Sequence, residues 1–316
     1  MPLSDSALEF LSLQAERVRR LPNKKRIVFP EGNDPRVIAA AARLAREGLA
    51  DPLLVRETSD KYSALYYERR RAKGVTRAEA SAIAKKPLYY ACLMVAAGDA
   101  DGFVGGAANS TADTVRAALH CIGPQPAVRT VSTFMVMCVR NRAHGAKGLL
   151  LFADPAMVIE PSAVELADIA IATAESARAL LGIEPVVALL SFSTKGSGKH
   201  EKADKVAEAL RIIRARAPAL HVDGEMQADA ALVEAVGRSK APGSTVAGKA
   251  NTLIFPEINS ANIGYKLVER LGDATAIGPF LQGLAKPAND LSRGCSAEDI
   301  YGAALVTALQ SEIVRG

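Results

Sequence analysis

The chain has 316 residues, of which 49% are hydrophobic and 23% charged, and its formal net charge is +5. This size and composition fit a globular protein with two domains, and no apolar run approaches the length of a membrane span. Aromatic residues make up 5% and tryptophan is absent, which argues against the stacking surfaces of single-stranded nucleic-acid binders. The positive balance instead favours an anionic small molecule, such as phosphate or a nucleotide-like cofactor, and we expect no nucleic-acid or membrane partner.

The histidines and cysteines give no indication of a metal site. The four histidines form no ligand cluster, and the four cysteines lack metal-ligand spacing and are expected to be reduced thiols. Acidic residues interrupt the N-terminal apolar pattern, which does not suit a signal peptide. We therefore expect a cytoplasmic protein. The acidic residues are Asp5, Glu9 and Glu16, and the cysteines are Cys92, Cys121, Cys138 and Cys295.

The first part of the chain alternates helical periodicity with short apolar runs. A helix is predicted from Ser4 and Asp5 through Val18. Caps and first-turn prolines predict further helix starts, and apolar runs predict strands. The helix starts are Asp34-Pro35, Pro87 and Ser110, and the strands are 27–29, 53–55 and 101–105.

The same alternation continues to the end of the chain. Strands are expected at 131–138, 148–152, 186–191, 220–223 and 252–255, and helices at 161–181, 201–215, 228–236, 260–271 and about 297–312. Short apolar strands between helices predict an α/β fold with mainly parallel sheets covered on both faces. Interruptions near 123–128 and 279–287 indicate domain boundaries.

Three short motifs resemble known binding sequences but lack their spacing. The segment 195–200 looks like the end of a P-loop, yet Ser193 occupies the position of the upstream glycine and His200 follows the lysine. No second histidine follows His200-Glu201 as a zincin requires, and the glycines of 102–106 miss the dinucleotide fingerprint. Asp223-Gly224-Glu225 fits either turn chemistry or a ligand contact at the mouth of a sheet.

The segment 287–299 places several potentially catalytic side chains close together in the sequence. It carries a hydroxyl, a fixed cation, a thiol and a carboxylate on what is expected to be a loop entering a helix, where anions are favoured. This is the outline of an acyl- or phosphoryl-transfer centre. Ser296 and Asp299 also have capping-box spacing, so Asp299 is a candidate cap as well as a candidate base, and the two roles can coexist. The other groups are Ser292, Arg293 and Cys295.

Long ordered blocks of the sequence resemble the phosphate acetyltransferases (phosphotransacetylases) of the phosphate acetyl/butyryltransferase family. The resemblance covers nearly the whole chain and is strongest in its last sixty residues. The blocks are 29–32, 100–116, 190–198, 223–225, 250–256, 262–266 and 278–296.

The resemblance implies reversible transfer of an acetyl group between coenzyme A and phosphate. It also implies coenzyme A as a substrate, no tightly bound cofactor, no metal ion and a homodimer. The implied fold has two three-layer α/β domains with the active site in the cleft between them. We expect the first domain to comprise 1–128 plus 281–316, and the second to comprise 129–280.

The resemblance also assigns roles in the attack of the coenzyme A thiolate on acetyl phosphate. Asp299 matches the base, Ser292 would orient the thiol or stabilise developing charge, and Arg293 would polarise the carbonyl or hold phosphate. A free aspartate is about 4.6 pKa units more acidic than a free thiol, a gap of about 6 kcal/mol. Burial of Asp299 or proton transfer concerted with attack would have to close that gap.

Further residues match the family's binding positions. Arg116 and Arg270 match active-site arginines, Arg70 aligns with an arginine that contacts the 3′-phosphate region of coenzyme A, and Ser110 and Thr111 are expected to bind substrate. Cys295 is expected to be a packing residue because direct transfer needs no covalent intermediate. The departures from the family pattern are Gly105 and Asn109, where serine and histidine are usual, and Ala117 in place of proline.

Other functions remain open at this stage. A phosphate butyryltransferase would differ only in its acyl preference. A non-catalytic acetyl-CoA-sensing domain would bind without turnover. A nucleic-acid binder has only the positive charge in its favour.

Overall fold

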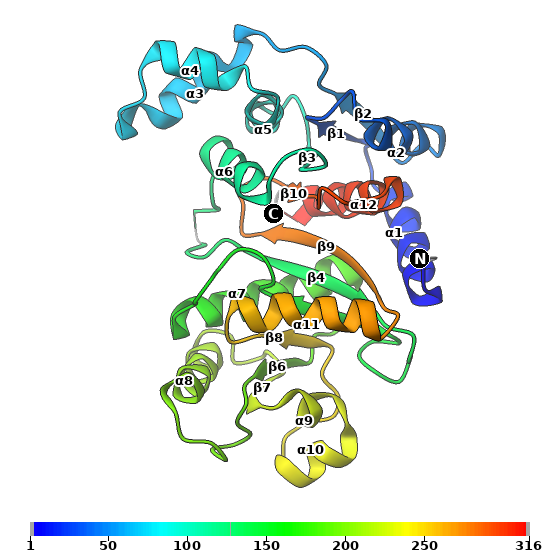
Figure 1. Ribbon diagram of the computed structural model, residues 1–316, viewed down its shortest axis with the longest axis vertical. Helices are drawn as coiled ribbons and strands as arrows, with labels where there is room; N and C mark the ends of the chain where they lie inside the picture. The colour runs from blue at the N-terminus through cyan, green and yellow to red at the C-terminus, as the bar shows by residue number, and fades with distance from the viewer. Residues whose placement is uncertain (1–2, 127, 314–316) are drawn as a thin grey trace. The chain divides into compact units, whose positions relative to one another are not determined.

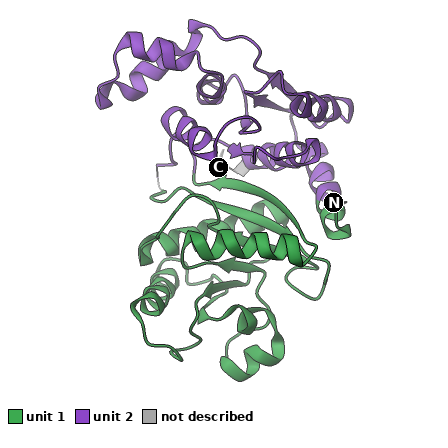
Figure 2. Ribbon diagram, in the orientation of Figure 1, with its two compact units in different colours: residues 1–10, 128–283 green, residues 11–127, 284–316 purple. Residues whose placement is uncertain are grey.

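The computed structural model describes residues 3–126 and 128–313, and the chain divides into two compact units (Figure 2). Unit 1 comprises 1–10 and 128–283, and unit 2 comprises 11–127 and 284–316. Helix α1 (Asp5–Arg19) begins in the residues of unit 1 and ends in those of unit 2. The domain limits expected from the sequence stay a prediction.

Unit 2 is built on a four-stranded sheet with the order β10-β3-β1-β2, in which every pair is parallel. The central strand β1 carries Ile27, Val28 and Phe29, all fully buried, as expected of a strand covered on both faces. The strands are β1 (Lys25–Phe29), β2 (Ala50–Leu54), β3 (Gly102–Gly105) and β10 (Ala288–Asp290).

Several helices of unit 2 begin where the sequence predicts, whereas α3 and α4 were not predicted (Figure 1). Asp34 caps α2 with Pro35 in its first turn, Pro87 begins α5, and Ser110 caps α6. The helices are α2 (Pro35–Arg46), α3 (Ser63–Arg70), α4 (Arg77–Ala84), α5 (Pro87–Ala97), α6 (Thr111–Cys121) and α12 (Ala297–Ile313), with short helical turns at Asp60–Tyr62 and Arg71–Lys73.

Unit 1 contains a six-stranded sheet with the order β7-β6-β8-β5-β4-β9. Its strands pair in parallel except at β4, which is antiparallel to both β5 and β9. Strand β9 was not expected from the sequence. The strands are β4 (Ser132–Cys138), β5 (Leu149–Ala153), β6 (Val187–Leu190), β7 (Val222–Met226), β8 (Thr252–Ile254) and β9 (Thr275–Gln282).

The helices of unit 1 follow the predicted ranges closely, with one correction. The helix expected at 228–236 is two short helices, because Val233 between them has an extended backbone. The helices are α7 (Ala163–Ser176), which continues as a π-helical turn at Ala177–Leu181, α8 (Glu201–Arg216), α9 (Ala228–Leu232), α10 (Glu234–Lys240) and α11 (Ile258–Leu271). The predicted α/β class with parallel sheets is confirmed.

Within residues 3–126 and 128–313, no helix is both long enough and apolar enough to cross a bilayer.

Candidate functional site

Three loops meet at the carboxyl edge of the unit 2 sheet. Strands β1, β3 and β10 are adjacent and parallel, so the segments that follow them leave from the same edge. Open α/β sheets bind ligands at this edge. Strand β10 takes up 288–290, part of the segment expected to be a loop, so the loop that precedes α12 is shorter and spans 291–296.

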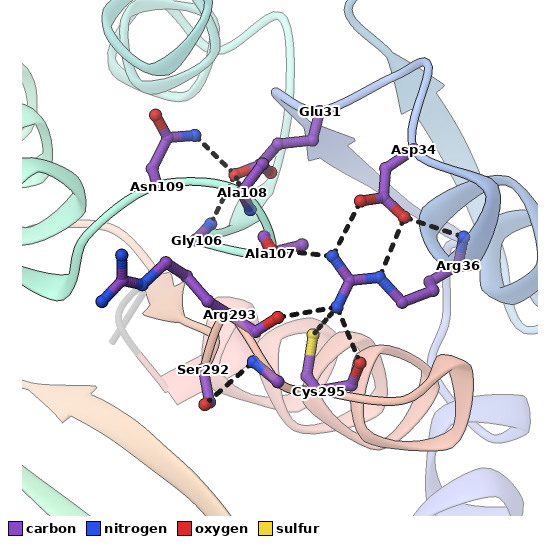
Figure 3. Close-up of polar contacts among 11 residues, drawn as sticks. Glu31, Asp34, Arg36, Gly106, Ala107, Ala108, Asn109, Ser292, Arg293 and Cys295 are labelled. Carbon is purple, nitrogen blue, oxygen red and sulfur yellow. Dashed lines mark hydrogen bonds and ion pairs between the residues drawn. The ribbon is translucent and has the colours of Figure 1, made fainter.

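Glu31, in the loop after β1, holds the loop after β3. Its Oε1 accepts hydrogen bonds from Gly106 N at 2.8 Å and Asn109 Nδ2 at 2.7 Å (Figure 3). Gly106 has a φ of 109°, and a Cβ there would lie 2.4 Å from Oδ1 of Asp290, so only glycine fits between these two carboxyl groups.

Two departures from the family pattern have a local explanation at this edge. Asn109 reaches Glu31 directly. A Cβ on Gly105 would lie 2.5 Å from the Phe103 ring and 2.7 Å from Pro30, so a serine there would displace its neighbours. The third departure, Ala117, is buried in α6, and nothing in the structure explains it.

Arg36, in the first turn of α2, joins the three loops (Figure 3). Its Nη1 donates to the carbonyl oxygens of Arg293 and Cys295, both at 2.9 Å, and its Nη2 donates to the carbonyl of Ala107 at 2.8 Å. Its Nε and Nη2 also hold the carboxylate of Asp34, at 3.1 and 2.8 Å. The Arg36 hydrogen bond lowers the pKa of Asp34.

Ser292 and Arg293 are exposed in the loop before α12. Ser292 Oγ accepts a hydrogen bond from Gly294 N at 3.3 Å, which leaves the hydroxyl proton for an acceptor outside this turn. The Arg293 carbonyl is held by Arg36, whereas its side chain extends away from Arg36 (Figure 3). The loop therefore presents a hydroxyl and a fixed cation to solvent.

Asp299 forms a complete capping box with Ser296. Its Oδ2 accepts from Ser296 N and from Ser296 Oγ, both at 2.8 Å, and Asp299 N donates back to Ser296 Oγ at 3.2 Å. The capping interpretation is confirmed. The catalytic interpretation stays a prediction.

Cys295 is buried beside Arg36, whose Nη1 lies 3.9 Å from Sγ. Burial raises the pKa of this thiol to about 11; Arg36 opposes the rise, and Asp299 adds to it. The side chain is therefore a neutral thiol near pH 7, which suits a packing residue better than a nucleophile.

Asp290 ends β10 and is 3% exposed. Burial raises its pKa to about 6, and the nearby charge of Glu31 adds to the rise. The Thr111 and Thr114 hydroxyls lie close enough to moderate the rise, although among the described residues no hydrogen bond of normal geometry ends on either Asp290 oxygen. The carboxyl groups of Glu31 and Asp290 thus interact at the sheet edge that carries Ser292 and Arg293.

Arg70 and Arg116 come together around His120. Burial lowers the pKa of His120, and the charges of Arg70 and Arg116 lower it further. Tyr66 and Tyr89 stack edge to face at 5.7 Å, and the Tyr66 hydroxyl lies 3.5 Å from His120 Nδ1. The two predicted arginines therefore share a half-buried aromatic patch.

Ser110 and Thr111 lie at the start of α6, in the turn before the one that carries Arg116. Ser110 Oγ donates to Asp113 Oδ2 at 2.7 Å and caps the helix, and Arg116 pairs with Asp113 Oδ1 at 2.7 Å. Substrate binding by these hydroxyls stays a prediction.

Arg270 belongs to unit 1, and the other seven predicted site residues belong to unit 2. It lies near the end of α11 with a side chain that is 73% exposed and 3.6 Å from Glu269.

Four residues at these places were not predicted as site residues: Glu31, Arg36, Asp290 and His120. Glu31 and Arg36 closely follow a buried strand, which is where α/β sheets place binding groups. Asp34-Pro35 was interpreted only as a helix start. Asp290 lies in a polar stretch that was not recognised as a strand.

Comparison with known proteins gives the family. The family model described as "Phosphate acetyl/butaryl transferase" matches residues 10–61 and 55–308. A phosphate acetyltransferase of Thermoanaerobacterium thermosaccharolyticum is 46% identical over 315 residues, which cover 92% of this chain and 96% of that protein. One from Paracoccus denitrificans is 47% identical over 307 residues, covering 91% and 95%.

A solved structure agrees with this. The crystal structure of a phosphotransacetylase from Streptococcus pyogenes matches with a TM-score of 0.89 and 44% identity, covering 97% of this chain and 99% of that chain. The chain thus belongs to the phosphate acetyl/butyryltransferase family.

Proposed function

We propose that this chain transfers an acetyl group reversibly between coenzyme A and phosphate. The observation that carries the proposal is the carboxyl edge of the unit 2 sheet, where Ser292, Arg293 and Asp299 occupy one loop and the helix turn that follows it. The printed names of relatives at 44–47% identity support the same reaction.

In the proposed reaction, the coenzyme A sulfur attacks the carbonyl carbon of acetyl phosphate. A C–S bond forms, the bond from carbon to the phosphate oxygen breaks, and phosphate leaves with the electron pair. The Ser292 hydroxyl has a proton to donate to the developing oxyanion or the thiol, because Gly294 N occupies one of its acceptor positions. Arg293 supplies a permanent planar cation for the acyl phosphate.

Asp299 is the proposed base. Both capping bonds that the Asp299 carboxylate accepts end on Oδ2, so Oδ1 is the atom proposed to receive the thiol proton. A free aspartate and a free thiol differ in pKa by the equivalent of about 6 kcal/mol. Because Asp299 is only half-buried, we propose that proton transfer concerted with attack closes this gap. Capping and catalysis are compatible in this arrangement.

Arg70 and Arg116 are proposed to bind the phosphates of coenzyme A, with Ser110 and Thr111 at the adjacent start of α6. Burial lowers the pKa of His120 and the charges of both arginines lower it further, which favours the neutral ring and leaves the arginines as the cations of this patch. Arg270 is proposed as a further phosphate-binding arginine.

The direct test is to supply purified protein with acetyl phosphate and coenzyme A. Thioester should form without added divalent metal and should persist in a chelator. Complete inactivity would overturn the proposal, and acetyl-CoA binding without turnover would favour a sensing domain instead. Parallel assays with butyryl phosphate would give the acyl preference.

The other expectations from the sequence are also proposals. We propose a homodimer in the cytoplasm, with no tightly bound cofactor, no metal ion and no nucleic-acid partner. Light scattering after gel filtration would measure the oligomeric state, and a monomer would overturn that part.

A further inference from the structure

Arg36 uses every N–H of its guanidinium group on the protein itself. Nε–H donates to Asp34, the two N–H groups of Nη1 donate to the carbonyls of Arg293 and Cys295, and those of Nη2 donate to Asp34 and Ala107. No N–H remains for a substrate. Whatever Arg36 does for the reaction, it does through other residues.

The bond to the Arg293 carbonyl has a consequence for Ser292. The C=O and N–H of a trans peptide point in opposite directions. Because the Arg293 carbonyl faces Arg36, the N–H of Gly294 faces the other way, where it donates to Ser292 Oγ at 3.3 Å. A continuous series of bonds therefore runs from Arg36 through one peptide plane to the exposed hydroxyl.

Arg36 fixes the orientation of the peptide between Arg293 and Gly294. A Cβ on Gly294 would meet only Ser292 Oγ, at 3.9 Å, so Gly294 is loosely packed. The bond from Cys295 N to the Ser292 carbonyl, at 2.9 Å, closes the turn, but a turn of this kind allows more than one orientation of its central 293–294 peptide. A rotated peptide would withdraw the N–H from Ser292 and redirect the Arg293 side chain. The bonds to Ala107 and Cys295 hold both ends of the arrangement in place.

We propose that Arg36 is a positioning residue that fixes the Arg293–Gly294 peptide and thereby orients the Ser292 hydroxyl and the Arg293 guanidinium for acyl transfer. The proposal rests on the proposed function of this loop. Lysine cannot replace Arg36, because an ammonium group lacks the planar fork that reaches a carboxylate and three carbonyls together.

Arg26 provides a matched control in the same sheet. It lies at the amino end of β1, where its Nε donates to Asp101 at 3.2 Å and its Nη2 donates to the Gly98 carbonyl at 2.8 Å. Like Arg36, Arg26 holds a carboxylate and a backbone carbonyl with its guanidinium group, but it lies at the opposite edge of the sheet from Ser292. Loss of Arg26 should cost stability without disturbing the loop.

The experiment compares Arg36→Lys with Arg26→Lys in the full chain. We expect Arg36→Lys to lower kcat by about 10- to 100-fold while KM for coenzyme A changes by less than about threefold. Arg26→Lys should keep kcat within about threefold at a comparable loss in Tm. Equal kcat in the two variants would overturn the positioning role.

Hydrogen exchange gives a readout that needs no turnover. The peptide spanning 291–296 should exchange faster in Arg36→Lys and at the wild-type rate in Arg26→Lys. Unchanged exchange in Arg36→Lys would overturn the inference even if activity falls. If the variants show this exchange pattern but the wild-type protein has no transferase activity, the result would support the role of Arg36 in fixing the peptide and overturn the proposed function. The two failures are therefore distinguishable.

Discussion

Asn109 Nδ2 lies 2.7 Å from Glu31 Oε1, and this bond joins the loops that follow β3 and β1. Glu31 also accepts from Gly106 N at 2.8 Å, so one carboxylate oxygen fixes both ends of a four-residue turn. Burial raises the pKa of Asp290, and the charge of Glu31 adds to the rise. The carboxyl groups of Glu31 and Asp290 therefore interact at the edge that presents Ser292 and Arg293.

Replacing Asn109 tests this support. Asn109→Ala removes one charge-assisted hydrogen bond and should lower the free energy of unfolding by about 1–2 kcal/mol. Asn109→Asp should cost more, because a third carboxylate would face Glu31 and Asp290. Urea unfolding at pH 8 measures both. An equal effect of the two variants would mean that the charge on Glu31 is not felt at Asn109.

The two roles of Asp299 are separable. Ser296→Ala removes the capping hydroxyl but keeps the carboxylate, so it should cost about 0.5–2 kcal/mol of stability while kcat stays within about threefold. Asp299→Asn should lower kcat by about 10²- to 10⁴-fold if the carboxylate takes the thiol proton. Steady-state rates and thermal unfolding are measured on both. Equal rates in the two variants would leave Asp299 only its capping role.

Asp290 gives a pH dependence of stability with a definite sign. Its pKa is raised from 3.8 to about 6, so between these values the folded state holds a proton that the unfolded state has released. Its contribution to stability is fully present below about pH 4, is lost as pH rises to about 6, and stays lost above. A shift of about 2 units corresponds to about 3 kcal/mol.

The measurement is the stability of wild type minus that of Asp290→Asn from pH 4 to 8, which should fall across this range. Asp60→Asn is the control, because hydrogen bonds from Ser81 and Lys85 lower the pKa of Asp60. The contribution of Asp60 is gained as pH rises to about 4 and is constant above, so its difference curve should be nearly flat from pH 4 to 8. A flat curve for Asp290→Asn would show that Asp290 is ionised throughout.

Arg70 and Arg71 are adjacent in the sequence, and replacing each in turn tests the proposed coenzyme A site. Arg70→Gln should raise KM for coenzyme A by about 10-fold, because one charge-assisted contact to a phosphate is lost. Arg71→Gln is the control, since Arg71 pairs with Glu68 at 3.0 Å on the exposed side of the same segment. A similar KM in both variants would remove Arg70 from the site.

Cys295 should be dispensable for the chemistry. Its pKa of about 11 leaves it protonated at neutral pH, so Cys295→Ala should retain kcat within about fivefold, whereas Ser292→Ala should lose far more. Mass spectrometry of wild type quenched during turnover should find no acetylated Cys295. An acetyl adduct on that sulfur would instead indicate a covalent mechanism.

Local sequence was sufficient for the helix starts at Asp34, Pro87 and Ser110, but it did not indicate α3 or α4. Ser110 and Asp34 begin helices because their side chains accept from backbone N–H groups a few residues ahead, which depends on near neighbours alone. The same holds for Ser296 and Asp299, whose capping box was predicted from spacing. The family resemblance added the reaction and the proposed roles, which spacing alone left open.

Strand β10 shows where local sequence was insufficient. Ala288-Asn289-Asp290 has no apolar run and was expected to be a loop, yet it pairs in parallel with Phe103-Val104-Gly105. A partner nearly two hundred residues away supplies the hydrogen bonds that make it a strand. Strand β9 was missed for the same reason, because its pairing with β4 is also remote in sequence.

The sequence by itself determined the α/β class, several capped helix starts and the placement of Ser292, Arg293 and Asp299 at the entrance to one helix, because these depend on periodicity and near neighbours. Only the tertiary structure decided that Arg36 holds the loop carrying those groups. Arg36 and Arg293 are 257 residues apart and meet because β1, β3 and β10 lie side by side and in parallel, which brings their carboxyl ends to one edge. Strand order is a property of the whole packed sheet, and no short stretch of sequence encodes it.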